Sequence, residues 1–281
     1  MALVNIGVEL ARMGRRVLLV DFDLEAPGLE TFNLPRPFHV KTPGLVEFVS
    51  NYLSTGIAPD VDEYIYESVR EGRNNGRLWI MPAGIQDETY ANRLNSIDWE
   101  MLYEEREGFL FFEDLKKQWE EQFRPDYVLI DSRTGYTDES GICTRQLPDA
   151  VIALFFPNDQ NFFGLKKVVT DIKKESQPPR EKNIQLHFVT SNVPDIDDED
   201  HILEDRMQRF RDYVADENLI GTIHHYNSLA LLNQVVFTSE RPRSRLAQEY
   251  RRLVKNLILE NPQDPEGARD FLWNVSGSVH R

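Results

Sequence analysis

Cysteine and long apolar runs are both scarce in this 281-residue sequence. The single cysteine, Cys143, excludes a disulfide within the chain and favours a cytoplasmic location. No apolar run approaches the roughly 20 residues that a membrane-spanning helix needs. The opening residues, MALVNIGVELARMGRR, lack the basic and then apolar pattern of a secretory signal. We therefore expect no membrane partner.

Basic residues are also fewer than acidic residues. The chain has 47 acidic residues against 32 lysines and arginines, a formal net charge of −15. Such a field repels nucleic-acid phosphates and anionic lipids, so only a local basic patch could bind them. One patch exists, formed by Arg241, Arg243, Arg245, Arg251 and Arg252. DNA binding through this patch is possible, but cations on the exposed face of a helix are the favoured interpretation.

Short apolar runs alternate with helical patterns along most of the chain. The apolar runs lack polar alternation, which is typical of strands covered on both faces. They lie at 17–20, 78–81, 127–130, 150–156, 184–190 and 219–223, and the helical patterns at 2–14, 108–123, 138–147, 160–175, 198–215 and 242–260. This alternation predicts an α/β fold with a doubly wound, mostly parallel sheet and helices on both faces.

The remaining segments are interpreted as additions to one domain. Residues 1–260 are predicted to form this domain, with helical elaborations at about 30–76 and 85–107. The first of these carries short helical patterns near 44–53 and 61–70, and the second resembles a pair of short helices around Trp99. Residues 261–281 begin with the turn-rich stretch NPQDPEGARD and are expected to form a loosely held tail.

Acidic residues directly follow two of the predicted strands. Asp21 and Asp23 end the first run, and Asp131 ends the run at 127–130. Ligands of doubly wound sheets bind at the carboxyl ends of strands, where carboxylates can hold Mg²⁺ against nucleotide phosphates. Side chains two apart on a strand point the same way, so Asp21 and Asp23 could share this work. Turn-forming aspartates are the alternative interpretation.

Six segments of the chain carry recognisable motifs. They are VLLVDFDLEAPGL at 17–29, LWIMPAG at 78–84, YVLIDSRTGYTDESGICT at 127–144, LPDAVIALFFPNDQNFFG at 147–164, HHYNSLA and SRLAQEYRRL at 244–253. Together these segments resemble the ParA/MinD-type P-loop ATPases, in particular a group with the phosphate loop KGGVGR followed by Ser or Thr. The resemblance implies Mg²⁺-dependent ATP hydrolysis that switches a homodimer, which in turn assembles with a protein partner.

The resemblance also implies roles for individual residues. Asp23 would position the attacking water, with Asp21 beside it near the Mg²⁺ ion, and Asp131 would be the Walker-B aspartate. The switch that contacts the γ-phosphate would include Thr134 and Gly135. The remaining nucleotide-binding residues would be Ser191, Asn192 and Pro194 beside the adenine, with Asn227 in a nearby later segment.

One motif of this group is missing from the sequence. The phosphate loop should follow a central strand and lead directly into the helix that here begins at Met1, yet no Gly-x-x-x-x-Gly-Lys/Arg-Ser/Thr motif occurs. The loop supplies backbone amides, a basic side chain and a hydroxyl to the phosphates and the metal ion. We expect roughly 15–20 further residues, about a strand plus a loop, upstream of an internal Met1. A truncated gene and a degenerate, non-hydrolysing protein are the alternatives.

Two other classes of function stay open at this point. The chain could be a nucleotide-independent interaction module that keeps the fold without the activity. It could also be an ATP-using metabolic enzyme of the same superfamily.

Overall fold

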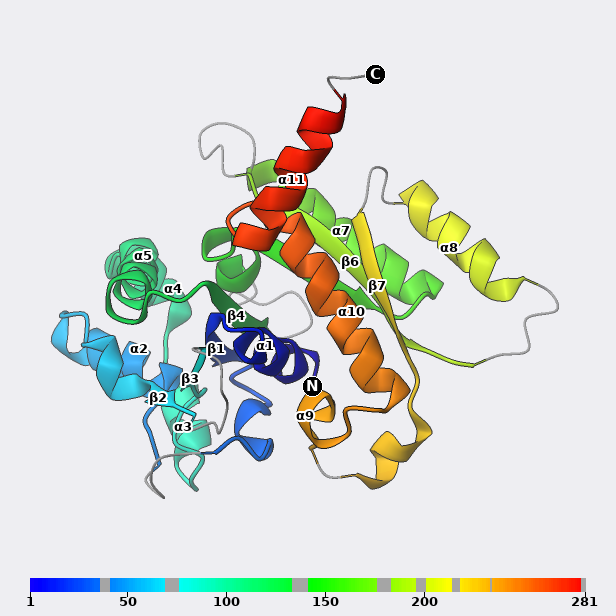
Figure 1. Ribbon diagram of the computed structural model, residues 1–281. Helices are drawn as coiled ribbons and strands as arrows, with labels where there is room; N and C mark the ends of the chain where they lie inside the picture. Colours follow the sequence, from blue (N-terminus) through cyan, green and yellow to red (C-terminus); the bar gives the residue numbers. More distant parts are fainter. Residues whose placement is uncertain are drawn as a thin grey trace. The chain divides into compact units, whose positions relative to one another are not determined.

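The computed structural model describes residues 1–35, 41–68, 76–132, 141–175, 183–195, 201–213, 218–232 and 234–278 (Figure 1). The chain divides into two compact units, which are described separately. The first comprises Met1–Leu147 with Gln234–Glu240, and the second comprises Pro148–Asn233 with Arg241–Arg281. The single domain expected over residues 1–260 stays a prediction.

The first unit is built on a four-stranded sheet with the order β2-β3-β1-β4. Its strands are β1 (Arg16–Phe22), β2 (Tyr66–Glu67), β3 (Arg77–Met81) and β4 (Tyr127–Ser132). Its helices are α1 (Ala2–Arg12), α2 (Leu45–Thr55), α3 (Tyr90–Asn95), α4 (Trp99–Glu105), α5 (Gly108–Gln118) and α9 (Phe237–Glu240), with shorter helical turns at η1 (Leu29–Thr31), η2 (Val61–Tyr64), η3 (Trp119–Phe123) and η4 (Ile142–Gln146). Strand β1 runs parallel to β3 and β4, and only β2 is antiparallel.

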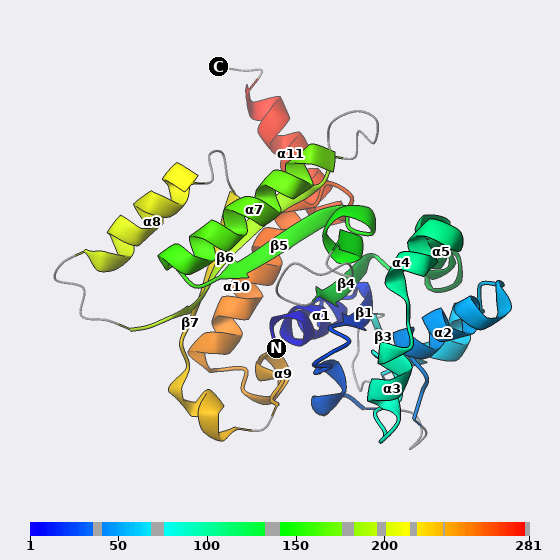
Figure 2. The same ribbon diagram turned by 180° about the vertical axis from the view of Figure 1, so that it is seen from behind.

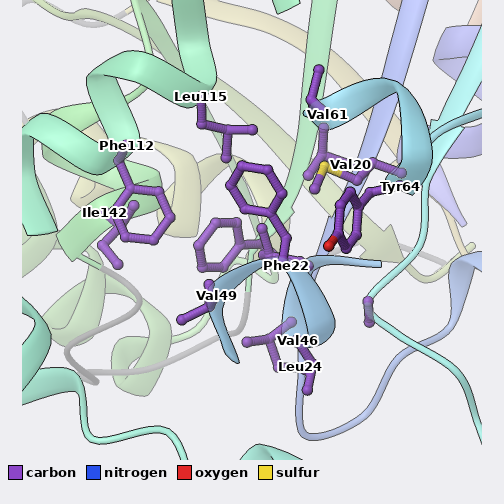
Figure 3. Close-up of a cluster of buried hydrophobic side chains, with 14 of the residues drawn as sticks. Val20, Phe22, Leu24, Val46, Val49, Val61, Tyr64, Phe112, Leu115 and Ile142 are labelled. Atoms are coloured by element: carbon purple, nitrogen blue, oxygen red, sulfur yellow. The ribbon is translucent and has the colours of Figure 1, made fainter. Parts of the chain in front are cut away.

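Helices cover β1 on both faces. Leu18, Val20 and Phe22 point into a cluster with side chains of α2 and α5, part of which Figure 3 shows. On the opposite face, a Cβ at Gly7 of α1 would lie 2.5 Å from Leu19 Cδ2, so α1 sits directly on the sheet. Both faces of β1 are therefore dry, which explains why its sequence is a continuous apolar run without polar alternation.

The second unit contains a three-stranded parallel sheet with the order β5-β6-β7. Its strands are β5 (Ala150–Phe155), β6 (Gln185–Val193) and β7 (Asn218–His224). Its helices are α7 (Asp159–Glu175), α8 (Ile202–Tyr213), α10 (Arg245–Glu260) and α11 (Pro265–Ser278), with a turn at η5 (Asn227–Leu231). Phe162 and Phe210 join α7 and α8 to Phe188 of β6, whereas Leu253 of α10 packs near Gly221 of β7. Figure 2 shows α7 in front of these strands, and Figure 1 shows α10 on their other side.

The strands occur where the apolar runs predict them, and the α/β architecture with parallel sheets is confirmed. Two local predictions are wrong. Residues 61–68 form the short turn η2 and strand β2 instead of one helix. Part of the expected tail is helix α11, which starts at Pro265 after Asp264, whose Oδ1 accepts from the Glu266 amide at 2.9 Å. Proline is favourable at the first helical position, so these residues begin a helix. None of the described helices is both long enough and apolar enough to cross a membrane.

Replacing Gly44 by alanine should lower the free energy of unfolding by about 1–3 kcal/mol, the usual cost of overpacking. The Leu45 amide donates to the Pro82 carbonyl at 2.9 Å, and a Cβ at Gly44 would lie 2.0 Å from that same oxygen. The start of α2 would therefore have to move away from the end of β3. Denaturant unfolding measures the change. Gly164→Ala is the control, because nothing lies within 4 Å of its Cβ position, and equal stability of both variants would contradict the prediction.

Candidate functional site

The three predicted carboxylates gather at one edge of the first unit. Asp21 lies opposite Asp131 in the register of the parallel strands β1 and β4, and Asp23 follows one residue beyond the end of β1. Parallel neighbouring strands end at the same edge of a sheet, so the structure brings together side chains that lie far apart in the sequence.

Two of these carboxylates are incompletely satisfied. The side chain of Asp21 is fully buried, and its Oδ2 accepts a hydrogen bond from the Leu29 amide at 3.0 Å. In the part of the chain that the structure describes, Asp21 Oδ1 and Asp23 Oδ1 are buried without a hydrogen-bond partner. A buried acceptor without a partner costs about 1–3 kcal/mol. A cation or its coordinated water could satisfy these oxygens.

The electrostatics of the site also favour a cation. Burial, together with the negative charges of Asp131 and Asp23, raises the pKa of Asp21 to about 7, although the hydrogen bond from the Leu29 amide acts in the opposite direction. Burial raises the pKa of Asp131 too, while the amino group of Met1 lowers it. Carboxylates crowded in this way are costly to ionise, and a divalent cation would remove that cost.

The start of α1 faces the same carboxylates. Burial lowers the pKa of the Met1 amino group, whereas the charges of Asp131 and Asp21 raise it. Helix α1 begins at Ala2, and no side chain caps its first turn. The first amides of a helix form an environment suited to phosphate, so carboxylates for a metal ion lie beside donors for an anion.

The carboxylates are too few to hold a metal ion by themselves. Across the described residues, no group of three histidine, cysteine or acidic side chains is arranged as a metal site. Mg²⁺ usually keeps several waters and binds one or two carboxylates together with substrate phosphates. Asp21 and Asp131 therefore fit a Mg²⁺ ion that arrives with a phosphate ligand.

The other predicted site residues fall outside the described residues or within the second unit. Thr134 and Gly135 fall outside the described residues. Ser191, Asn192 and Pro194 belong to the second unit, at the end of β6 and just after it. Asn192 has a left-handed backbone (φ 59°), and its Oδ1 lies 2.7 Å from His225 Nδ1. Their role in binding adenine stays a prediction, as does that of Asn227, the first residue of η5.

The arginine patch of the second unit is partly neutralised. Arg245 forms ion pairs with Asp195 at 2.7 Å and with Glu249 at 3.0 Å. Arg251 donates to the Pro242 carbonyl at 2.7 Å. Arg241 and Arg243 are exposed, and Arg252 lines a cleft of about 290 Å³ between β7 and α10. Acidic partners reduce the positive field of the patch, which weakens the case for DNA.

Tyr90 is absent from the sequence-based predictions although it lies beside the site. Its hydroxyl donates to the Leu24 carbonyl at 2.7 Å, directly after Asp23. The sequence of residues 85–107 indicates only short helices, and no local pattern identifies a partner 66 residues away.

Several solved structures share this architecture. MinD cell division protein from Aquifex aeolicus matches with a TM-score of 0.58 and 16% identity, over 92% of this chain and 91% of that one. A ParA family ATPase from Chlorobium tepidum matches with a TM-score of 0.61 and 15% identity, over 91% and 90%. The chain has the MinD/ParA fold.

A metabolic enzyme shares the MinD/ParA fold as well. Cobyrinic acid a,c-diamide synthase from Mycobacterium smegmatis, solved with bound ADP and magnesium, matches with a TM-score of 0.60 and 19% identity, over 92% of this chain and 88% of that one. A scan against protein-family models finds no match, and a search of curated proteins finds none either. At these identities the similarity establishes the fold alone.

Proposed function

We propose that this protein binds ATP with Mg²⁺, hydrolyses it slowly, and uses the nucleotide to control a homodimer. The observation that carries the proposal is that Asp21 and Asp23 each have a buried carboxylate oxygen without a hydrogen-bond partner, beside Asp131 and the start of α1. The MinD/ParA fold and the neighbour solved with ADP and magnesium support it.

Each carboxylate has a distinct task in this proposal. Asp21 and Asp131 would hold Mg²⁺, which neutralises charge on the phosphates when bound. Asp23 would orient the water that attacks the γ-phosphorus, and the bond to the β-phosphate oxygen would break to give ADP and phosphate. A water held in line by a carboxylate reacts without the entropy cost of finding its geometry.

The proposal also requires a phosphate-binding loop joined to the start of α1. Two observations fit this position: the start of α1 lies near the carboxylates, and β4 is the last strand in the order of the described sheet of the first unit. All six residues of β4 are partly exposed, although β1 beside it is almost wholly buried. An apolar strand that ends the described sheet could pair with one further strand, which would lead into the loop.

Binding of ATP and Mg²⁺ is the first test. We would translate the in-frame DNA upstream of the Met1 codon, and purify the 281-residue chain and the chain extended by any strand and loop encoded there. ATP at 100 times its dissociation constant should stabilise the extended chain by about 2.7 kcal/mol. Light scattering should show that ATP converts monomer to dimer, and EDTA should abolish both effects.

Two outcomes of these measurements would contradict the proposal or part of it. An in-frame stop codon directly upstream, together with a melting temperature unaffected by ATP and Mg²⁺, would reject the proposal. It would favour a nucleotide-independent interaction module. A dimer that forms equally without nucleotide would reject the switch while leaving ATP binding in place.

A further inference from the structure

The loop that follows β1 is fixed at both of its ends. At its far end, the Leu29 amide donates to Asp21 Oδ2 at 3.0 Å. At its near end, the Leu24 carbonyl accepts the hydroxyl of Tyr90 at 2.7 Å, and this hydrogen bond is buried. Leu24 and Leu29 are themselves buried. Asp23 lies directly before the first of these fixed points, so the position of its backbone depends on the Tyr90 contact.

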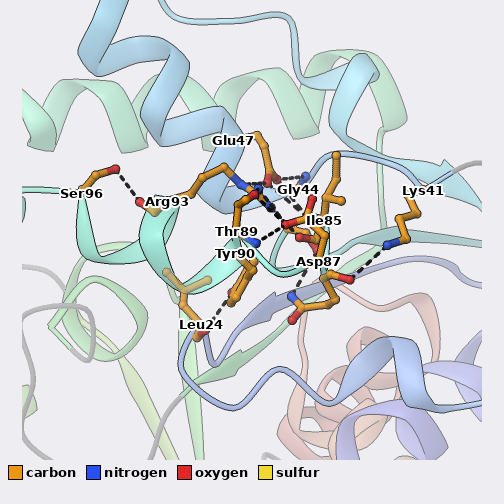
Figure 4. A network of polar contacts seen from close by, with 12 residues as sticks. Leu24, Lys41, Gly44, Glu47, Ile85, Asp87, Thr89, Tyr90, Arg93 and Ser96 are labelled. Carbon is orange, nitrogen blue, oxygen red and sulfur yellow. Dashed lines mark hydrogen bonds and ion pairs between the residues drawn. The ribbon is translucent and has the colours of Figure 1, made fainter.

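Tyr90 is in turn held by a network of charged groups, which Figure 4 shows. The Arg93 guanidinium carbon lies 6.0 Å from the centre of the Tyr90 ring, and Arg93 Nε donates to Glu47 Oε1 at 3.0 Å. A second guanidinium nitrogen of Arg93 forms an ion pair with Asp87 at 3.0 Å. These contacts keep Arg93 in place over the tyrosine ring.

Glu47 connects this network to the ends of α2 and β3. Its carboxylate accepts hydrogen bonds from the Gly44 amide at 2.9 Å and from the Ile85 amide at 3.2 Å. A Cβ at Gly84 would lie 2.9 Å from Glu47 Oε2 and 3.0 Å from Tyr90 Cε2. The absence of a side chain at Gly84 therefore lets Glu47 and Tyr90 approach each other closely.

We infer that Tyr90 is a positioning residue for Asp23: its hydroxyl holds the Leu24 carbonyl and so fixes the carboxylate that would orient the attacking water. Glu47 and Arg93 hold Tyr90 in the required place. The catalytic part of this inference rests on the proposed ATPase function, whereas the structural part does not. Burial raises the pKa of Tyr90 to about 12, so the hydroxyl keeps the proton that it donates at neutral pH.

Tyr90→Phe tests the structural part on the 281-residue chain itself. The variant removes one hydroxyl and keeps the ring, so the fold should survive. Loss of the hydrogen bond to the Leu24 carbonyl, typically worth about 0.5–1.5 kcal/mol, should speed amide hydrogen exchange at Leu29 and its neighbours about 2- to 10-fold. Tyr52→Phe is the matched control, because the Tyr52 hydroxyl also donates to a backbone carbonyl at 2.7 Å, that of Arg106. Equal exchange at Leu29 in both variants would overturn the inference.

Steady-state kinetics test the catalytic part in the chain that carries the phosphate loop. Tyr90→Phe should lower kcat about 3- to 10-fold with an unchanged KM for ATP, while Tyr52→Phe changes neither. Because Tyr90 acts through Asp23, adding Tyr90→Phe to Asp23→Ala should cause no further loss. Additive losses would overturn the positioning role. A chain that neither binds nor hydrolyses ATP would instead reject the proposed function, and the exchange experiment would still decide the contact.

Discussion

Asp23→Ala in the chain that carries the phosphate loop should lower kcat for ATP hydrolysis about 10²- to 10⁴-fold, the usual contribution of a residue that activates water. Binding of ATP should persist, because Asp23 is expected to contact the attacking water and not the nucleotide. Steady-state phosphate release measures turnover. Light scattering should show an ATP-bound dimer that outlives the one formed by the unmodified chain.

A matched control separates the loss of Asp23 from the loss of any other aspartate in the same unit. Asp98 lies in the same unit, and its Oδ1 accepts a hydrogen bond from the Met101 amide at the start of α4. Asp98→Ala removes a helix cap, which costs about 1 kcal/mol of stability, and should leave kcat unchanged. Equal turnover of Asp23→Ala and the unmodified chain would reject the role of Asp23.

Asp21→Asn should raise the free energy of unfolding at pH 8 and leave it nearly unchanged near pH 4. The pKa of Asp21 is about 7 in the folded chain, against a usual 3.8. Between these values the unfolded chain releases the proton that the folded chain retains, so the stability of the unmodified protein falls as the pH rises. The difference corresponds to roughly 4 kcal/mol at pH 8. Asparagine avoids this cost, and its carbonyl oxygen can still accept from the Leu29 amide.

Other ionisable groups face Asp21 and shape the measured curve. Asp131 and Asp23 add negative charge, and the Met1 amino group adds positive charge. All three groups are present in both proteins. The difference in free energy of unfolding between Asp21→Asn and the unmodified protein therefore reports the contribution of residue 21 better than the pH dependence of either protein alone. Urea unfolding at the two pH values, without nucleotide or Mg²⁺, measures this difference. The same gain in stability at pH 4 and pH 8 would contradict the prediction.

The expected result also exposes a conflict between stability and function. Asp21→Asn should stabilise the protein without ligand and weaken the binding of Mg²⁺, because a neutral amide is a poorer ligand than a carboxylate. A destabilising carboxylate is retained at little cost where the ligand satisfies it.

Much of the architecture could be predicted from local patterns. The run VLLV at 17–20 predicts a strand covered on both faces, and β1 has that environment between α1 and the cluster around Phe22. The two short helices around Trp99 occur as α3 and α4. These predictions hold because the period of apolar residues reports directly on which faces are buried.

Other features escaped sequence reasoning for physical reasons. The helical period near 61–70 is overridden by β2, which pairs Tyr66 with Ile80 and Glu67 with Trp79. Such pairing draws its stability from a partner strand and not from the local sequence. Helix α11 was not predicted because its first turn contains a proline and a glycine, which are typical of turns. A proline at the first helical position, however, starts a helix without disrupting it.

By itself, the amino-acid sequence determined the alternation of strands and helices and the acidic residues after two strands, because periodicity and turn chemistry are local properties of the chain. Only the tertiary structure decided that Asp21 lies opposite Asp131, that Asp21 is fully buried, and that the Tyr90 hydroxyl reaches the Leu24 carbonyl. Strand order and the burial of a charge depend on contacts between distant segments, which no short stretch of sequence encodes.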